Sequence, residues 1–176
     1  MRTLNQNGFI EVTVTDQLLQ EALDRNNSFY QRFGNAGTHR LDKDRQRKTG
    51  YLAESAVKSV CPRLGFSIDP SVDFVLHGIT FDVKAQGCNS PPKPDFVGTI
   101  YEEQKARETD FYIFTRVSND FKKVWIAGLI SKTNFFNKSR LISAGTTNNN
   151  FTYDQSRYEI AYSELLPPLA LLGKPV

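Results

Sequence analysis

Three residues that could support phosphate chemistry lie close together in the segment 72–86, VDFVLHGITFDVKAQ. Asp73 lies near its start, and Asp82 and Lys84 lie near its end. Carboxylate oxygens are the ligands that hard cations such as Mg²⁺ prefer, and Mg²⁺ keeps open positions for water and phosphate. A lysine ammonium beside such an ion could polarise an attacking water or neutralise a phosphate. These residue types favour metal-dependent phosphate chemistry if the fold brings them together.

The dipeptide His77-Gly78 predicts how the segment folds. It separates two apolar-rich runs, and a glycine at the second position of a two-residue loop suits the tight turns that join antiparallel strands. The resulting register pairs Leu76 with Ile79, Phe74 with Phe81 and Asp73 with Asp82. Directly opposed side chains have Cβ atoms only about 4.5 to 5.5 Å apart, where like charges destabilise the hairpin. A divalent cation held by Asp73 and Asp82 would offset that repulsion.

Alternation along the second strand separates an apolar face from a polar one. The apolar face carries Ile79, Phe81, Val83 and Ala85. The polar face carries Thr80, Asp82, Lys84 and Gln86. Asp73 is expected to share the polar face, so the candidate ligands and Lys84 should point to the same side of the sheet.

A third carboxylate, Glu54, lies in the expected helix GYLAESAVKSV, residues 50–60. Thr49 can cap this helix, and Pro62 stops it. Helical spacing places Glu54 beside the apolar stripe, from where it could reach an adjoining cleft. The alternative is an ordinary exposed pair between Glu54 and Lys58, four residues apart.

The most basic stretch of the chain, residues 40–48, directly precedes this helix. We expect it to be an irregular segment that grips phosphates along a nucleic-acid backbone, although charge runs are often simply solvated. Its basic residues are Arg40, Lys43, Arg45, Arg47 and Lys48.

Other patterns supply the framework that would position these residues. A strand is expected at 9–15 and a short helix at 16–26, which Asn26-Asn27 should end. The runs 109–117 and 123–131 are so apolar that they should form a hairpin of central strands covered on both faces. We expect loops at 87–98 and 134–157, a polar helix at 101–108, a strand at 158–165 and an apolar tail, 165–173, that docks on the core.

Composition describes a globular protein of one domain. The chain has 176 residues, 39% hydrophobic and 23% charged, which argues against disorder. The net charge of +3 permits a polyanionic partner without requiring one. Two isolated cysteines, Cys61 and Cys88, argue against structural zinc or a disulfide scaffold. The chain shows neither a signal peptide nor an apolar run of about 18 residues, so we expect a cytoplasmic protein without membrane association.

A helix with a glutamate, then an aspartate, then Asp-x-Lys on a strand, and then two apolar strands resembles the PD-(D/E)xK nuclease superfamily. The resemblance covers about residues 49–132. It implies an α/β fold with a central mixed β-sheet flanked by helices, the restriction-endonuclease-like core. Val72 stands where the family motif has proline, and the literal Pro94-Asp95 follows Asp-x-Lys, so Asp95 is interpreted as a loop residue.

The resemblance also implies roles for individual residues. Asp73 and Asp82 would bind Mg²⁺, Lys84 would assist water activation, and Glu54 would complete the metal or water shell. Gln86 resembles a polar addition found in part of the superfamily, and the Val83 carbonyl would be a further metal ligand. Mn²⁺ is a plausible substitute for Mg²⁺.

The sequence therefore predicts a Mg²⁺-dependent endonuclease that hydrolyses DNA phosphodiester bonds. One alternative is a module of the same fold that binds nucleic acid without cutting it. Another is a structural or interaction protein in which Asp73 and Asp82 are merely exposed strand residues. A homodimer would suit cleavage of both DNA strands, but no sequence pattern identifies an interface.

Overall fold

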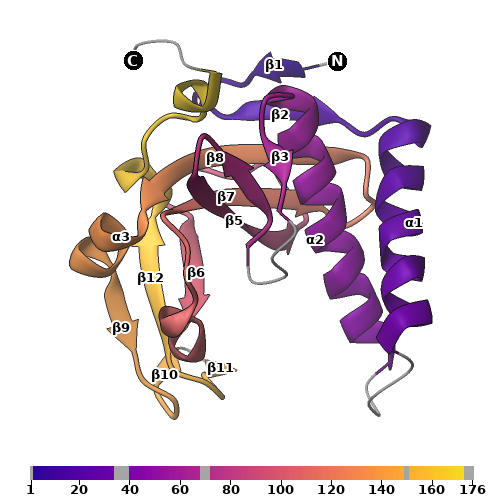
Figure 1. Cartoon of the computed structure of the whole chain (residues 1–176). Coiled ribbons are helices and arrows are strands. Elements are labelled where there is room, and N and C mark those ends of the chain that lie inside the picture. The colour runs from indigo at the N-terminus through magenta and orange to yellow at the C-terminus, as the bar shows by residue number, and fades with distance from the viewer. Residues whose placement is uncertain (1, 34–39, 68–71, 149–150, 173–176) are drawn as a thin grey trace.

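The computed structural model describes residues 2–33, 40–67, 72–148 and 151–172. It is an α/β fold built on a large mixed sheet (Figure 1). The helices are α1 (Asp16–Phe33), α2 (Arg40–Val60) and α3 (Lys132–Lys138), with 3₁₀ helices η1 (Glu102–Ala106), η2 (Tyr162–Glu164) and η3 (Pro168–Leu172). The strands are β1 (Arg2–Leu4), β2 (Ile10–Thr13), β3 (Gly65–Phe66), β4 (Phe74–Leu76), β5 (Ile79–Cys88), β6 (Val97–Tyr101), β7 (Phe111–Ser118), β8 (Lys123–Ser131), β9 (Arg140–Ile142), β10 (Thr147–Asn148), β11 (Phe151–Thr152) and β12 (Arg157–Ala161).

The large sheet has seven strands in the order β1-β2-β8-β7-β5-β4-β3. Its neighbours are antiparallel except β5 and β7, which run parallel over residues 81–88 and 111–118. A smaller antiparallel sheet has the order β6-β12-β9, and β10 pairs with β11. The predicted α/β class with a central mixed sheet is confirmed.

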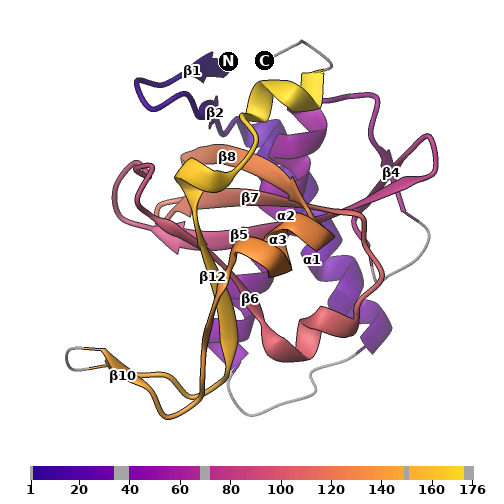
Figure 2. The ribbon, with the colours of Figure 1, turned by 90° about the vertical axis from the view of Figure 1, so that its left-hand side faces the viewer.

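Two separate cores cover the two faces of the large sheet. The helix-side core places α2 against the sheet through residues such as Leu52, Val57, Phe81, Val83 and Ile113, and α1 lies against α2. The small-sheet core lies on the opposite face and includes Ile100, Tyr112, Phe114, Phe135 and Ile160. Figure 2 shows β6, β12 and α3 in front of the central strands and the long helices behind them. The prediction that β7 and β8 are central and covered on both faces is therefore confirmed.

The first hairpin forms as the sequence predicts. Leu76 pairs with Ile79 and Phe74 with Phe81. His77 and Gly78 have φ angles of 51° and 81°, the left-handed conformation that a type I′ turn requires at both central positions. Gly78 tolerates this conformation without steric cost, which explains why the turn occurs at this point.

Both predicted helix boundaries in the N-terminal third are wrong. Asn26-Asn27 does not end α1, which continues to Phe33, because Asn26 is buried and donates a hydrogen bond to Asp44 of α2. The basic segment is not irregular, since α2 begins at Arg40. Thr49 is therefore inside the helix, where its hydroxyl donates to the Arg45 carbonyl instead of capping a terminus. Residues 34–39 lie outside the described residues.

Two segments expected to be loops contain regular structure. The proline-rich stretch ends in β6, and the polar stretch 134–157 contains most of α3 together with β9, β10 and β11. β6 and β9 are held by pairing with β12, and α3 is held by the buried Phe135, whereas β10 and β11 pair with each other. The polar segment after Tyr101 is the 3₁₀ helix η1, and η3 docks Leu171 into the helix-side core as expected. In the described part of the chain, no helix is long and apolar enough to cross a membrane.

Candidate active site beside the β4–β5 hairpin

Asp73 lies where β4 stops pairing with β5. The ladder ends at the pair of Phe74 and Phe81, so Asp73 does not form the next regular pair with Asp82. Instead its backbone NH donates to the Phe81 carbonyl at 3.0 Å, and its carboxylate accepts a hydrogen bond of 2.7 Å from the Val83 NH. The predicted pairs of Phe74 with Phe81 and Leu76 with Ile79 are confirmed, but the predicted pair of Asp73 with Asp82 does not form. Asp73 contacts β5 through both its backbone NH and its carboxylate.

Asp82 and Lys84 point to the same side of β5, as predicted. Asp82 is 5% exposed, and its Oδ2 lies 2.7 Å from the Lys84 Nζ. The Lys84 ammonium also donates to the Gln104 side chain of η1 at 3.1 Å. Lys84 therefore links the buried carboxylate to the small-sheet side of the molecule.

Glu54 is buried on α2 and does not form the alternative pair with Lys58. Its carboxylate contacts the Arg25 guanidinium at 2.6 Å, and Arg25 in turn lies over the rings of Tyr51 and Phe66, each 4.7 Å from the guanidinium carbon. Lys58 donates to backbone carbonyls at the end of the helix. The Arg25 guanidinium of α1 thus holds the Glu54 carboxylate in place.

The pKa values of Asp73 and Glu54 are both raised. Burial raises the pKa of Asp73 to about 8, and the nearby charges of Glu54 and Asp82 contribute to the rise. Burial also raises the pKa of Glu54, an effect that Arg25 opposes and Asp82 reinforces. Concentrating negative charge in a region of low dielectric is costly unless a cation compensates it. The region therefore has the electrostatic character of a cation site.

The available ligands are all oxygens, which fits Mg²⁺ or Mn²⁺. The NH and carbonyl of one strand residue point to the same edge, so the Val83 carbonyl lies on the edge where its NH meets Asp73. Within residues 2–33, 40–67, 72–148 and 151–172, however, no three acidic, histidine or cysteine side chains surround one point closely enough to hold an ion. Lys84 and Arg25 compensate Asp82 and Glu54 in this conformation. Binding of an ion would require these cations to move.

A cleft of about 490 Å³ adjoins the site along the part of β5 that β4 leaves unpaired. One wall is α2, with Arg45 and Thr49, and the other is formed by β6 and η1, with Tyr101 and Gln104. Figure 1 shows α2 and β6 on opposite sides of β5. Lys84 lines the cleft, whereas Glu54, Asp73 and Asp82 are not among its lining residues, and Asp82 is connected with the cleft through its ion pair with Lys84. The cleft could therefore hold a substrate and present it to Lys84.

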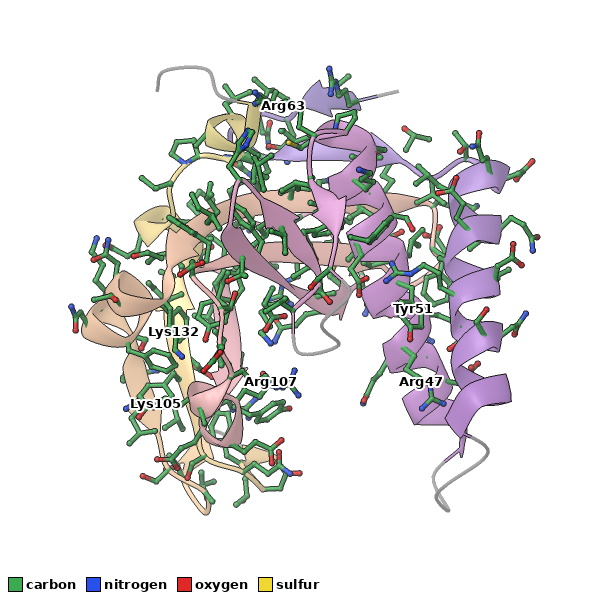
Figure 3. All side chains as sticks on the ribbon, in the orientation of Figure 1. Arg47, Tyr51, Arg63, Lys105, Arg107 and Lys132 are labelled. Carbon is green, nitrogen blue, oxygen red and sulfur yellow. The ribbon has the colours of Figure 1, made fainter. Side chains whose placement is uncertain are left out.

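The predicted nucleic-acid-binding residues occupy different places on α2. Arg45 lines the cleft, with its guanidinium bonded to the Asn119 carbonyl. Lys48 forms an ion pair of 2.9 Å with Asp44, and Arg47 lies on the α2 side of the opening (Figure 3). The side chains of Arg40 and Lys43 lie outside the described part. Of this basic group, the structure connects Arg45 most directly with the site.

Several residues at the site were not predicted from the sequence. Arg25 and Gln104 contact Glu54 and Lys84, but neither belongs to a motif. Tyr112 pairs with Asp82 in the parallel ladder, and burial together with the Asp82 charge raises its pKa to about 12. Arg107, which Figure 3 places at the end of η1, faces the opening from the side opposite α2. The apolar run at 109–117 would have indicated a buried Tyr112, but only the strand order reveals its neighbour.

Gln86, which the family resemblance singled out, lines the cleft two residues beyond Lys84. Its Oε1 is buried and has no hydrogen-bond partner among the residues that the structure describes. A search against known protein families found no match to this chain, and a search of curated proteins found no significant similarity.

Proposed function

We propose that the protein is a Mg²⁺-dependent endonuclease that hydrolyses DNA phosphodiester bonds through a PD-(D/E)xK-type site on a restriction-endonuclease-like core. The observation that carries this proposal is the proximity of three carboxylates, the buried Glu54 and Asp82 and the partly buried Asp73, to one another and to a lysine that lines a cleft. The order of elements supports it, because a helix bearing Glu54, the β4–β5 hairpin and the strands β7 and β8 follow one another as the superfamily resemblance implies.

Asp73, Asp82 and the Val83 carbonyl would hold the ion, and Glu54 would complete its shell or hold a second ion. The bound ion would lower the pKa of a water ligand and stabilise negative charge on the phosphate. Asp73 would keep its carboxylate against the Val83 NH, which fixes its position at the strand edge. Binding of the ion would not need to order the backbone of β5, because pairing with β7 already holds that strand in place.

Lys84 would act on the substrate side of the site. Its ammonium is held between Asp82 and Gln104, so a modest movement of the side chain within the cleft brings it to an attacking water or a phosphate oxygen. Gln104 would keep the ammonium oriented after its contact with Asp82 is released. This arrangement would bring a positive charge to the phosphate as it gains negative charge during hydrolysis.

The test is a nicking assay with supercoiled plasmid and single-stranded DNA in Mg²⁺ or Mn²⁺. We expect cleavage by the wild type and a loss of at least about a hundredfold in Asp82→Asn and Lys84→Ala. Asp95→Asn is the matched control, because Asp95 belongs to the literal Pro-Asp pair but is exposed in a loop. Equal nicking by wild type, Asp82→Asn and Lys84→Ala would refute the assignment of the site.

A second candidate function is a module that binds nucleic acid without cutting it. It is favoured by the two ion pairs that already compensate Asp82 and Glu54 without a metal. This candidate predicts DNA binding with a steep salt dependence and no cleavage in either metal. A metal titration by calorimetry, with Asp82→Ala as the control, separates the two, since only the nuclease requires the ion.

A further inference from the structure

Arg116 of β7 is held rigidly in the cleft beyond Lys84. Its Nε donates to the Tyr162 hydroxyl at 2.7 Å, and its Nη2 donates to the Val97 carbonyl at 2.8 Å. The rings of Phe96 and Tyr162 lie 5.6 and 5.5 Å from its guanidinium carbon. The side chain lines the cleft, and among the described residues nothing accepts a hydrogen bond from its Nη1. One donor group of a fixed guanidinium is therefore available to a ligand.

The surroundings of Arg116 favour an anion. Gln86 pairs with Arg116 in the parallel ladder and lines the same cleft, where its side-chain NH₂ is the group that could donate to an anion. Arg45 supplies a second guanidinium from α2. Among the described residues that line this cleft there is no aspartate or glutamate, so nothing in its wall neutralises the two arginines.

We propose that Arg116, with Arg45 and Gln86, forms a subsite for a backbone phosphate of the DNA strand that is not the phosphate being cut. The proposal rests on the proposed nuclease function, since it names how that cleft would hold its substrate. Gln86 lies two residues from Lys84 on β5, a separation of about 7 Å along the strand.

The chemistry of the Arg116 guanidinium explains why a phosphate is the expected ligand. A planar guanidinium presents its donors in a fixed geometry that matches phosphate oxygens, and fixing it in advance reduces the entropy lost on binding. The contacts with Tyr162 and Val97 provide that fixation. A phosphate held at this point would hold the strand along the unpaired edge of β5 and bring the neighbouring linkage to Lys84.

The test measures binding of a fluorescein-labelled DNA duplex by anisotropy in EDTA, across a range of salt concentrations. Arg116→Gln and Arg45→Gln should each reduce the slope of log affinity against log salt by about 0.9, the change expected for one lost phosphate contact. Arg116→Lys should keep the wild-type slope because it keeps the charge. Arg63→Gln is the control, since it removes the same charge from an exposed position that Figure 3 shows far from the opening.

The outcomes separate this proposal from the proposed function. Reduced slopes for both cleft variants, with an unchanged slope for Arg63→Gln, support the subsite. An unchanged slope for either variant, or an equal reduction for Arg63→Gln, overturns it even if the wild type cuts DNA. Reduced slopes without any cleavage by the wild type would support the subsite and refute the nuclease. If Arg116→Gln melts well below the wild type, Arg45→Gln and Arg116→Lys decide the result.

Discussion

Replacing Asp73 by asparagine should stabilise the protein in the absence of metal, increasingly so at high pH. Burial raises the pKa of Asp73 from an ordinary value of 3.8 to about 8. The folded protein therefore holds this proton more tightly than the unfolded chain does. Below about pH 4 both states are protonated and the carboxyl costs nothing. As the pH rises from about 4 to 8, the ionised carboxylate increasingly favours unfolding, and above pH 8 the cost is complete.

The size of the effect follows from the shift. A difference of about four pKa units corresponds to at most about 6 kcal/mol, at about 1.4 kcal/mol per unit. The asparagine Oδ1 can still accept the hydrogen bond from the Val83 NH, so the substitution removes the charge while it keeps the contact. We expect Asp73→Asn to be neutral at pH 4 and more stable than the wild type by a few kcal/mol at pH 8.5.

Urea unfolding in EDTA at pH 4, 6 and 8.5 measures this directly, and Trp125, the single tryptophan, provides the fluorescence signal. Asp110→Asn is a control for which the opposite change in stability is expected at high pH. Its carboxylate accepts hydrogen bonds from the Thr80 NH at 2.8 Å and hydroxyl at 2.9 Å, which lower its pKa. Asp110→Asn should therefore lose stability at pH 8.5. A stability difference between Asp73→Asn and wild type that does not change with pH would refute the electrostatic reasoning.

Two further predictions concern packing and metal binding. A Cβ at Gly98 would lie 2.5 Å from the Phe114 ring, so Gly98→Ala should lower the free energy of unfolding in urea by about 1 to 3 kcal/mol. Gly50 lies in α2 with open space beside it, so Gly50→Ala should raise the free energy of unfolding by about 0.5 to 1 kcal/mol. Mg²⁺ at about a hundred times its dissociation constant should stabilise the wild type by about 2.7 kcal/mol in thermal unfolding but not Asp82→Ala, and an equal stabilisation of both would exclude Asp82 as a ligand.

The hairpin was predictable from the sequence because its determinants are local. A glycine at the second turn position and the alternation along β5 fix the turn, the register and the side to which Asp82 and Lys84 point. The apolar runs of β7 and β8 were equally clear, since a strand covered on both faces needs apolar side chains throughout.

The helix ends and the cleft were not predictable in this way. Asn26 would end an isolated helix, but its burial against α2 and its bond to Asp44 override that preference. The opposite wall of the cleft depends on β6 pairing with β12, about 60 residues later in the chain. Arg25 reaches Glu54 only because α1 packs on α2. Contacts of this kind follow from tertiary packing, which no local pattern encodes.

The early end of β4 makes Asp73 part of the backbone bonding of the sheet. Its carboxylate accepts from the Val83 NH, a bond that a peptide carbonyl would supply if the strand continued. Asp73→Ala would leave this NH without its acceptor, at a cost of about 1 to 3 kcal/mol if it stays buried. The alignment of β5 and the position of the candidate ligand therefore depend on the same side chain, so a substitution of Asp73 alters the sheet as well as the proposed site.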